Sequence, residues 1–313
     1  MEGPVKIFSG KAGKQLTQEI CNFLDIPMGR SETHVFKNDN IMVTIQENVR
    51  EADVFVVQPS CTPVSDGIME LLIMIDALRG ASARRITAIL PYFPYSRSDK
   101  KDRPRISITA RLMADLIQTA GADRVLTMDL HSPQIQGFFR IPVDQLMAAP
   151  LISNFYKERD LSNHVLIAGD AGEMKELGRY ANLLQLPMAV IDKRRHGDDD
   201  KAVAKNLIGD VKAKHCLIID DEISTGGTMI EAANFLMNRE ALSVCAAATH
   251  GVLAADAATR IQNSHIQELI VTNTIPLSAP KQVAKVKVLS VAPMFAKAIK
   301  RIHEGSSVSD LFS

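Results

Sequence analysis

The stretch Cys216-Leu-Ile-Ile-Asp-Asp-Glu-Ile-Ser-Thr-Gly-Gly-Thr228 decides the fold of this 313-residue chain. Its first residues form the short apolar run of a buried strand, and its paired glycines indicate a turn before the helical periodicity that follows. A strand that passes through a short loop into a helix is the repeating unit of parallel sheets covered by helices. The stretch therefore predicts an α/β fold.

The same alternation of short β-branched runs and longer helical patterns extends along the chain. The expected strands are 6–9, 41–45, 54–58, 86–90, 124–128, 165–169, 188–192, 216–220, 243–249, 268–272 and 286–289, and the expected helices are 67–79, 108–120, 175–184, 228–237 and 291–301. The layout of residues 54–90 resembles that of residues 217–247, which indicates an internal repeat. We therefore expect two similar domains, 1–148 and 149–313, each a mainly parallel sheet flanked by helices.

The composition excludes several classes of function. Lys plus Arg and Asp plus Glu both number 36, and this balance argues against a broadly basic surface for nucleic acid or membranes. The four cysteines (Cys21, Cys61, Cys216 and Cys245) form no C-x-x-C pair, so we expect neither a zinc site nor a disulfide framework. With no signal-peptide core and no apolar run near the roughly 18 residues of a membrane span, a cytoplasmic location is expected.

The loop that follows the apolar strand has the chemistry of a phosphosugar site. Its members are Asp220, Asp221, Ser224, Thr225, Gly226, Gly227 and Thr228. The glycines let the backbone approach a ligand, the hydroxyls add donors, and the helix N-terminus favours an anion. The paired acids can accept from ribose hydroxyls or hold hydrated Mg²⁺. A turn with a Ser or Thr helix cap is the simpler alternative, but it does not account for the two adjacent acids.

This loop resembles the 5-phosphoribosyl 1-diphosphate (PRPP) binding motif of type I phosphoribosyltransferase folds. The resemblance then widens to nearly the whole chain, which is similar to the ribose-phosphate diphosphokinase (PRPP synthetase) family. The segments that carry it include Lys6-Ile-Phe-Ser-Gly10, Met69-Glu-Leu-Leu-Ile-Met74, Asp99-Lys-Lys-Asp102, Met128-Asp-Leu-His131, Ile141-Pro-Val-Asp144, Asp170-Ala-Gly172, Thr249-His-Gly251 and Val271-Thr-Asn-Thr-Ile-Pro276.

The resemblance implies a reaction and a fold. Members of the family transfer the diphosphoryl group of Mg–ATP to the anomeric hydroxyl of ribose 5-phosphate, which gives PRPP and AMP. We accordingly expect two phosphoribosyltransferase-like domains, Mg²⁺ as cofactor, ATP and ribose 5-phosphate as substrates, and self-association to dimers and hexamers. Positioning and charge neutralisation matter more than covalent catalysis in such chemistry.

The resemblance also implies roles for individual residues. Lys193 and Arg195, just past an expected strand, would be the catalytic pair of a flexible loop, offering a point charge and a fork to the transferring group. The expected ATP-binding residues are Phe36, Asn38, Asn40, Arg97, Ser98 and His131, the pyrophosphate loop is Asp170, Ala171, Gly172 and Glu173, and the metal ligands are His131 and Asp170. A structural histidine, a turn aspartate and a solvated charged hairpin are the simpler alternatives for these positions.

Regulation by anions is a further expectation. The residues concerned are Lys100, Lys101, Arg103, Arg105, Asp144, Ser307 and Ser309. The chain also departs from the family pattern at Asn40, Ser98, Glu173, Glu176 and Ser224, which leaves nucleotide specificity and the charge of the pyrophosphate loop open. Added carboxylates near a triphosphate repel it unless Mg²⁺ or a salt bridge compensates.

Three functions remain open at this point. The first is an active PRPP synthetase, which the intact K-x-R pair and the glycine loop favour. The second is a non-catalytic, regulatory paralogue that acts through oligomerisation. The third is a phosphoribosyltransferase that uses PRPP to modify a base, although the two-domain length argues against it.

Overall fold

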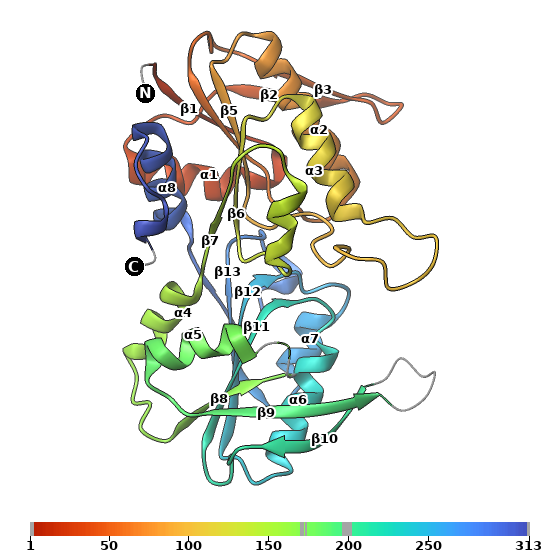
Figure 1. The fold of residues 1–313 in the computed structure, drawn as a ribbon, viewed down its shortest axis with the longest axis vertical. Helices are drawn as coiled ribbons and strands as arrows, with labels where there is room; N and C mark the ends of the chain where they lie inside the picture. Colours follow the sequence, from red (N-terminus) through yellow and green to blue (C-terminus); the bar gives the residue numbers. More distant parts are fainter. Residues whose placement is uncertain (1–2, 170–171, 173, 196–201, 312–313) are drawn as a thin grey trace. The chain divides into compact units, whose positions relative to one another are not determined.

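The chain folds into two units (Figure 1). The computed structural model describes residues 3–169, 172, 174–195 and 202–311, and for residues 193–195, 202–205 and 310 it describes the backbone alone. Unit 1 comprises Met1–Met147, Thr274–Pro276 and Ser290–Ser313, and unit 2 comprises Ala148–Asn273 and Leu277–Leu289. The sequence assigned the whole of residues 149–313 to one domain, whereas the C-terminal residues fold with unit 1.

Unit 1 is built on a five-stranded parallel sheet in the order β1-β4-β5-β6-β7. The strands are β1 (Val5–Ser9), β4 (Asp53–Val57), β5 (Arg85–Leu90), β6 (Arg124–Met128) and β7 (Val143–Leu146). Helices α2 (Val64–Gly80) and α3 (Thr109–Ala120) cover one face, and α1 (Lys14–Leu24) and α8 (Ala292–Glu304) cover the other (Figure 1). Both faces of β4 are therefore buried, which explains its continuous apolar run.

Helix α8 joins unit 1 because one of its faces is strongly apolar. Phe295, Ile299 and Ile302 recur at three and four residues, and each is at most 4% exposed. Their burial against the sheet and α1 removes this face from water, so the C-terminal segment folds with the N-terminal sheet.

A separate two-stranded hairpin is attached to unit 1. Its strands β2 (Ser31–Val35) and β3 (Ile41–Ile45) pair antiparallel, with Thr33 opposite Val43. Val43 on β3 is buried in the cluster that also contains the apolar face of α2. The sequence predicted β3 but not β2, because β2 is mostly polar and lacks a clear apolar alternation.

Unit 2 contains a seven-stranded sheet in the order β10-β9-β8-β11-β12-β13-β14. The strands are β8 (His164–Ala168), β9 (Met188–Arg195), β10 (Ala202–Ile208), β11 (His215–Ile223), β12 (Ser243–Gly251), β13 (Ile266–Thr272) and β14 (Val286–Leu289). All neighbours pair in parallel except β9 and β10, which form an antiparallel edge. Helices α4 (Ala149–Lys157) and α5 (Met174–Leu184) lie on one face, with α6 (Gly227–Met237) and α7 (Ala257–Gln262) on the other (Figure 1).

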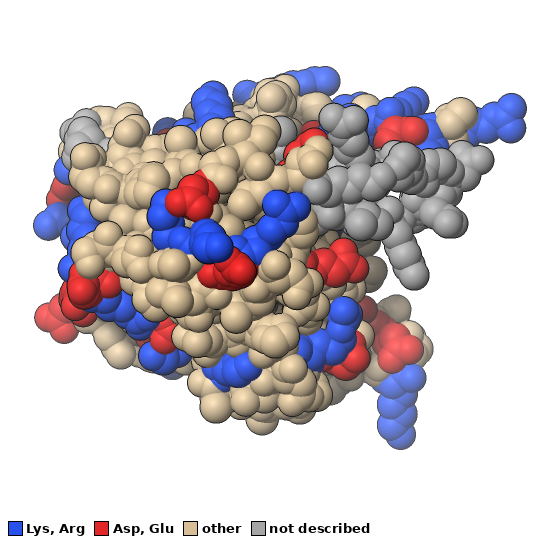
Figure 2. All heavy atoms as spheres, turned by 90° about the horizontal axis from the view of Figure 1, so that it is seen from below, with Lys and Arg blue, Asp and Glu red and all other residues tan. Residues whose placement is uncertain are grey.

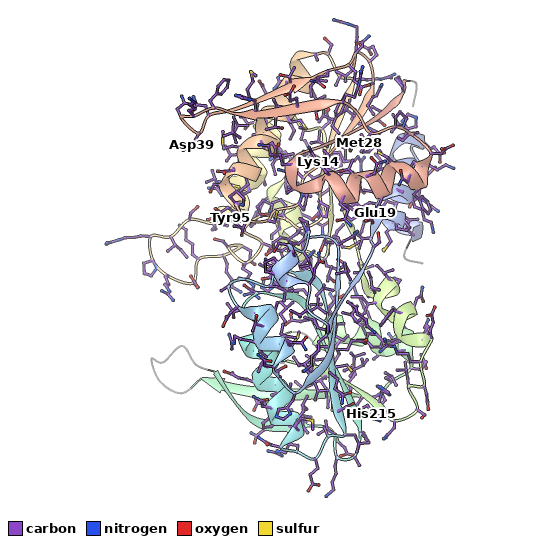
Figure 3. All side chains as sticks on the ribbon, turned by 180° about the vertical axis from the view of Figure 1, so that it is seen from behind. Lys14, Glu19, Met28, Asp39, Tyr95 and His215 are labelled. Carbon is purple, nitrogen blue, oxygen red and sulfur yellow. The ribbon has the colours of Figure 1, made fainter. Side chains whose placement is uncertain are left out.

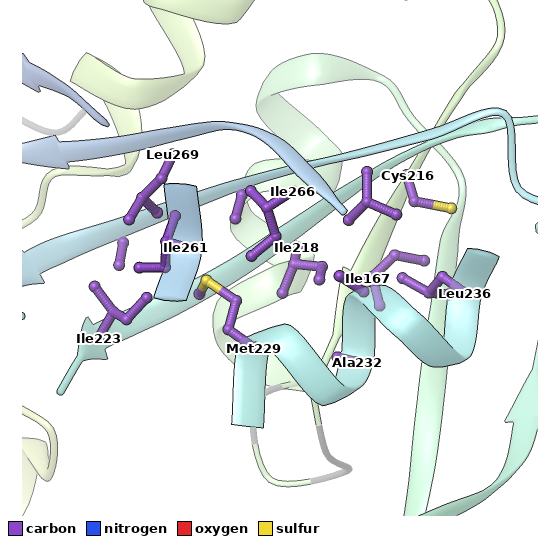
Figure 4. Packing of buried hydrophobic residues seen from close by; sticks show 14 of the residues in the cluster. Ile167, Cys216, Ile218, Ile223, Met229, Ala232, Leu236, Ile261, Ile266 and Leu269 are labelled. Carbon is purple, nitrogen blue, oxygen red and sulfur yellow. The ribbon is translucent and has the colours of Figure 1, made fainter. Parts of the chain in front are cut away.

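The packing of α6 fixes the position of the loop that precedes it. Met229 and Leu236 lie in one buried cluster with Ile218 of β11 and Ile261 of α7 (Figure 4). These side chains are each at most 4% exposed, so α6 has little freedom to move over the sheet. The first turn of α6 is thereby held at the carboxyl end of β11.

The fold confirms the α/β class expected from the sequence. The units β4–α2–β5 and β11–α6–β12 each join two neighbouring parallel strands through a helix, as the internal repeat indicated. Short 3₁₀ turns complete the chain at Lys11–Gly13, Pro133–Phe138, Ala279–Lys281 and Ser309–Leu311. Among the helices of the described residues, none has both the length and the apolar character to cross a membrane.

Candidate active site

The glycine loop after β11 is shaped by Gly226. This residue caps α6 with φ of 72°, in the left-handed region, and it offers no side chain to bond the helix N-terminus. A residue with a Cβ pays roughly 1–2 kcal/mol for this backbone conformation. The first N–H groups of α6 lack partners within the helix, as in any α-helix, so this end is suited to an anion. The backbone at Gly226 is therefore compatible with the predicted phosphate loop, and the role of the loop stays a prediction.

The loop is held from outside by the segment between β12 and α7. The backbone N–H groups of Leu253 and Ala254 donate to the carbonyls of Ile223 and Ser224, each at 3.0 Å. The Arg260 guanidinium of α7 donates to the carbonyl of Thr225 at 3.2 Å. Sequence reasoning missed Arg260, because no motif connects it to a loop 35 residues earlier.

The paired acids Asp220 and Asp221 lie within β11 rather than at its end. The sequence predicted that the strand stops at Asp220, but it continues to Ile223 because Glu222 and Ile223 are buried beside β12. The Asp221 N–H donates to a carboxylate oxygen of Asp220, and the Glu222 N–H donates to Asp221, both at 2.8 Å. Both acids remain half-buried at the carboxyl edge of the sheet.

Another predicted loop begins at the same carboxyl edge of the sheet, after the neighbouring strand β8. Strand β8 ends at Ala168, which pairs with Ile219 of β11, so the segment after β8 begins beside Asp220. Of the pyrophosphate loop, Gly172 is exposed, whereas Asp170, Ala171 and Glu173 lie outside the described residues. Their roles therefore remain predictions.

Lys193 and Arg195 lie on β9 and not beyond it, which corrects the sequence expectation. They pair across the antiparallel edge with Ala204 and Ala202 of β10, and this pairing extends the strand. Val190 of β9 pairs with Ala168, the last residue of β8. Lys193 and Arg195 follow Val190 by three and five residues, so they lie roughly 10 and 17 Å beyond the end of β8. Their side chains are outside the description, as are residues 196–201 of the expected flexible loop.

In unit 1, Arg97, Ser98 and His131 follow two adjacent strands. β5 and β6 pair directly, with Leu90 opposite Thr127, so the segments after them start at one edge. Left-handed backbone at Tyr95 (φ 56°) and Asp129 (φ 35°) precedes Arg97 and His131, both of which are exposed.

Ser98 also forms hydrogen bonds to the start of α3. Its Oγ accepts from the Thr109 N–H at 3.3 Å, and its carbonyl accepts from the Ala110 N–H at 3.1 Å. These bonds close the base of the exposed loop that holds Lys100, Lys101, Arg103 and Arg105. The serine at this position thus supports the basic loop.

Phe36, Asn38 and Asn40 lie together at the tip of the β2–β3 hairpin, where Asp39 is labelled in Figure 3. The Phe36 N–H donates to the Asn40 carbonyl at 2.9 Å, and the Asn40 N–H donates to Asn38 Oδ1 at 3.3 Å. The Phe36 ring is 43% exposed and meets the edge of His34 with 4.7 Å between centroids. An exposed aromatic beside two amides suits a purine base, and the contact between His34 and Phe36 is one that sequence reasoning missed.

The remaining regulatory candidates have partners within unit 1. Asp144 on β7 forms an ion pair with Arg124 of β6. Ser307 and Ser309 are linked through their hydroxyls at 3.1 Å, and Arg301 of α8 donates to the Ser307 carbonyl at 2.5 Å. The structure therefore holds the C-terminal serines in a defined turn.

The acidic and basic side chains are mixed rather than segregated on the face seen in Figure 2, where both kinds are scattered over a largely uncharged surface. The described residues contain no cluster of three or more His, Cys, Asp or Glu side chains arranged for a metal. Asp220 and Asp221 nevertheless offer carboxylate oxygens, the donor type that Mg²⁺ takes together with water and substrate phosphates.

Known proteins match this chain over most of its length. Residues 5–121 match the family model described as the N-terminal domain of ribose phosphate pyrophosphokinase, and residues 196–313 match the phosphoribosyl synthetase-associated domain. The phosphoribosylpyrophosphate synthetase of Mycobacterium smegmatis has a similar structure, with a TM-score of 0.91, 41% identity, and coverage of 97% of this chain and 100% of that one.

Curated relatives give the same result. The chain is 47% identical over 310 residues to the ribose-phosphate pyrophosphokinase of Caldanaerobacter subterraneus subsp. tengcongensis, which covers 99% of this chain and 98% of the relative. It is 48% identical over 315 residues to the enzyme of that name from Deinococcus radiodurans, with the same coverage. The chain therefore belongs to the ribose-phosphate pyrophosphokinase family of enzymes.

Proposed function

We propose that the protein transfers the diphosphoryl group of Mg–ATP to the anomeric hydroxyl of ribose 5-phosphate and releases PRPP and AMP. One observation carries the proposal furthest. The loop Ser224–Thr228 turns at the left-handed Gly226 into the N-terminus of α6, directly after the paired acids of β11. Family membership supports the same reaction.

The loop and the acids account for the sugar phosphate. The N–H groups of the first turn of α6 and the hydroxyls of Thr225 and Thr228, both exposed, would bind the 5-phosphate. Asp220 and Asp221 would accept hydrogen bonds from the ribose hydroxyls. This binding would orient the anomeric oxygen for attack, and orientation is a large part of catalysis in such a reaction.

ATP would be bound by the residues of unit 1. Phe36 would stack on the adenine while Asn38 and Asn40 contact the edge of the base. The exposed Arg97 and His131 would contact the triphosphate with charge and hydrogen bonds.

The chemical step is a displacement at phosphorus. The anomeric oxygen forms a bond to the β-phosphorus, the bond from that phosphorus to the α–β bridging oxygen breaks, and AMP leaves with that oxygen. The proton of the anomeric hydroxyl passes to solvent. Lys193 and Arg195 would stabilise the charge that develops on the transferring group.

Mg²⁺ fits the donors of this chain, and when bound it supplies charge neutralisation to the triphosphate. Asp170 and His131 are the ligands that the family resemblance indicates, and a carboxylate of Asp220 or Asp221 is the alternative to its contact with the ribose. The departure at Glu176 need not repel ATP, because its carboxylate lies 3.7 Å from the Arg179 guanidinium on α5.

An assay with ATP labelled at the γ-phosphorus tests the proposal. In the presence of Mg²⁺ and ribose 5-phosphate, AMP should form and the label should appear in PRPP. A ribose 5-phosphate analogue without the anomeric hydroxyl is the matched control, and it should give no AMP. Absence of AMP from the folded, oligomeric protein would instead favour the regulatory paralogue, and PRPP consumption that depends on a base would favour a phosphoribosyltransferase.

Self-association to dimers and hexamers and sensitivity to phosphate stay predictions. Sedimentation of the purified protein measures the first. The rate measured from zero to millimolar phosphate tests the second, and a flat profile would reject it.

A further inference from the structure

A carboxylate is buried where the hairpin meets the sheet of unit 1. Glu70 on α2 is 3% exposed, and burial of an ionised group is costly unless hydrogen bonds compensate. Its two oxygens accept from the Lys11 N–H at 3.2 and 3.1 Å, from Thr33 Oγ1 at 2.6 Å and from Gln58 Nε2 at 2.9 Å. These partners are neutral donors, so the geometry depends on hydrogen bonds rather than on a counter-ion.

The three donors come from three different segments. Lys11 follows β1, Gln58 follows β4, and Thr33 lies in the middle of β2. Gln58 is fixed further by its bond to the Gly67 carbonyl at 3.1 Å. Glu70 therefore joins the hairpin to the edge of the five-stranded sheet through one buried group.

The hairpin needs such attachments because it is a sheet of its own. It has no strand pairing with the five-stranded sheet, and an isolated two-stranded hairpin is marginally stable in water. Val43 of β3 is buried against α2, which holds one strand by apolar contact. On β2, the Thr33 hydroxyl supplies a polar contact to Glu70 of the same helix.

A second attachment holds the base of the hairpin. Glu47, just beyond β3, accepts from Lys6 Nζ at 2.5 Å and from the Arg30 N–H at 2.6 Å. Burial opposes its ionisation, but these hydrogen bonds lower the pKa of Glu47 below its ordinary value. The hairpin is thus held at its base by Glu47 and in its middle by Thr33. Its tip extends beyond both attachments.

We infer that Glu70 is a positioning residue for ATP, acting through Thr33 to hold Phe36, Asn38 and Asn40 at the tip. This inference rests on the proposed function. From Thr33 the strand runs to Val35, so Phe36 at the start of the tip lies roughly 10 Å away, and a tilt of about 10° at Thr33 displaces it by roughly 2 Å. A misplacement of about 1 Å already weakens catalysis substantially.

Substitution of Thr33 tests the inference without removing the buried carboxylate. Thr33→Val deletes the donor and keeps the β-branched shape, whereas Thr33→Ser keeps the hydroxyl. Thr44→Val is the matched control, because Thr44 lies exposed on the facing strand β3. We expect Thr33→Val to raise the Kd for Mg–ATP about tenfold and to leave the Kd for ribose 5-phosphate within twofold.

The binding measurements need no turnover, so they separate this inference from the proposed function. Calorimetry with Mg–ATP alone and with ribose 5-phosphate alone gives the two Kd values for each variant. Near wild-type binding of ATP by Thr33→Ser and Thr44→Val completes the expected pattern. An unchanged ATP Kd in Thr33→Val, or an equal loss for both ligands, overturns the positioning role, whereas failure of the wild type to form AMP counts against the proposed reaction alone.

Glu70→Gln gives a second, independent arm. A glutamine has one acceptor oxygen and adds an N–H₂ group that faces the donors of Lys11, Thr33 and Gln58. We expect hydrogen exchange to accelerate at the β2 and β3 amides in this variant, together with the rise in ATP Kd. A loosened hairpin with an unchanged Kd for ATP would contradict the inference.

Discussion

Asp53 Oδ2 lies 2.8 Å from Nδ1 of His303, although 250 residues separate the two in the sequence. The carboxylate can only accept, so the imidazole donates. Asp53 is fully buried on β4 and also accepts from Arg85 at 2.8 and 2.6 Å. Arg85 in turn donates to the Ile302 carbonyl of α8 at 3.1 Å. This network fastens the C-terminal helix to the first sheet.

Removal of the Asp53 carboxylate should destabilise unit 1 strongly. Asp53→Ala leaves Arg85 without its partner in a mostly buried position, and breaking such a pair costs on the order of 3–5 kcal/mol. Asp115→Ala is the matched control, since its ion pair with Arg111 is exposed and should change the free energy of unfolding by about 1 kcal/mol or less. Denaturant titration measures both, and similar losses in the two variants would refute the assigned role.

Gly226→Ala should weaken the phosphate loop through its backbone alone. The nearest atom to an added Cβ is 3.6 Å away, so the strain arises from φ of 72° and not from crowding. We expect a loss of roughly 1–2 kcal/mol in the free energy of unfolding and a higher KM for ribose 5-phosphate. Gly80→Ala makes the same change at the end of α2, where the added Cβ meets no atom within 4 Å, and it should be neutral or stabilising. Equal effects at the two positions would argue against backbone strain at Gly226.

Lys193 and Arg195 should be needed for turnover and not for folding. Each alanine substitution should lower kcat by roughly 10²–10³-fold, the range for loss of one group that stabilises transition-state charge. Arg194→Ala removes a charge from the position between them on β9 and should change kcat far less. The assignment fails if the double variant Lys193→Ala with Arg195→Ala keeps near-full turnover while its Tm is unchanged.

Acidification should destabilise unit 2 through Glu268. Burial opposes the charge of this carboxylate, but hydrogen bonds from Arg159 and Lys287 lower its pKa below 4.5. Since the folded pKa lies below the unfolded one, the stabilisation is complete above pH 4.5 and is lost as the pH falls through the lowered value. The Tm should therefore drop below pH 4.5, and the drop should be shallower in Glu268→Gln. Glu304→Gln on the exposed side of α8 is the control, and its acid profile should match that of the wild type.

The buried cysteines should resist thiol reagents. Burial raises the pKa of Cys216 to about 12 and that of Cys21 to about 11, so little thiolate exists at pH 8. In the native protein we expect alkylation of Cys61, which is half-buried, to precede alkylation of the other two. Mass spectrometry after timed exposure to iodoacetamide measures the order, with guanidinium-unfolded protein as the control. Native Cys216 reacting as fast as Cys61 would show that the thiol is accessible.

The sequence predicted best the strands that carry a clear apolar pattern, for a physical reason. β3, β6 and β14 have the predicted bounds, and β4 differs by one residue at each end, because apolar residues and turn residues mark where such strands begin and end. The strands β2, β7 and β10 were not predicted, since short or partly polar strands carry a weaker pattern. The helices α1, α4 and α7 were also missed.

The candidate site likewise has a part that the sequence predicted and a part that it did not. The order of acids, hydroxyls and glycines from Asp220 to Thr228 is local, so the sequence alone was enough to predict the loop, the α/β class and the family resemblance. The support of that loop by Arg260, the attachment of the hairpin by Glu70 and Thr33, and the pairing of Asp53 with His303 were decided only by the tertiary structure. Each joins single polar groups from 35 to 250 residues apart, and no periodicity or spacing marks such partners. Only the packing of helices on sheets brings them within hydrogen-bond distance, because burial of apolar faces determines which distant segments become neighbours.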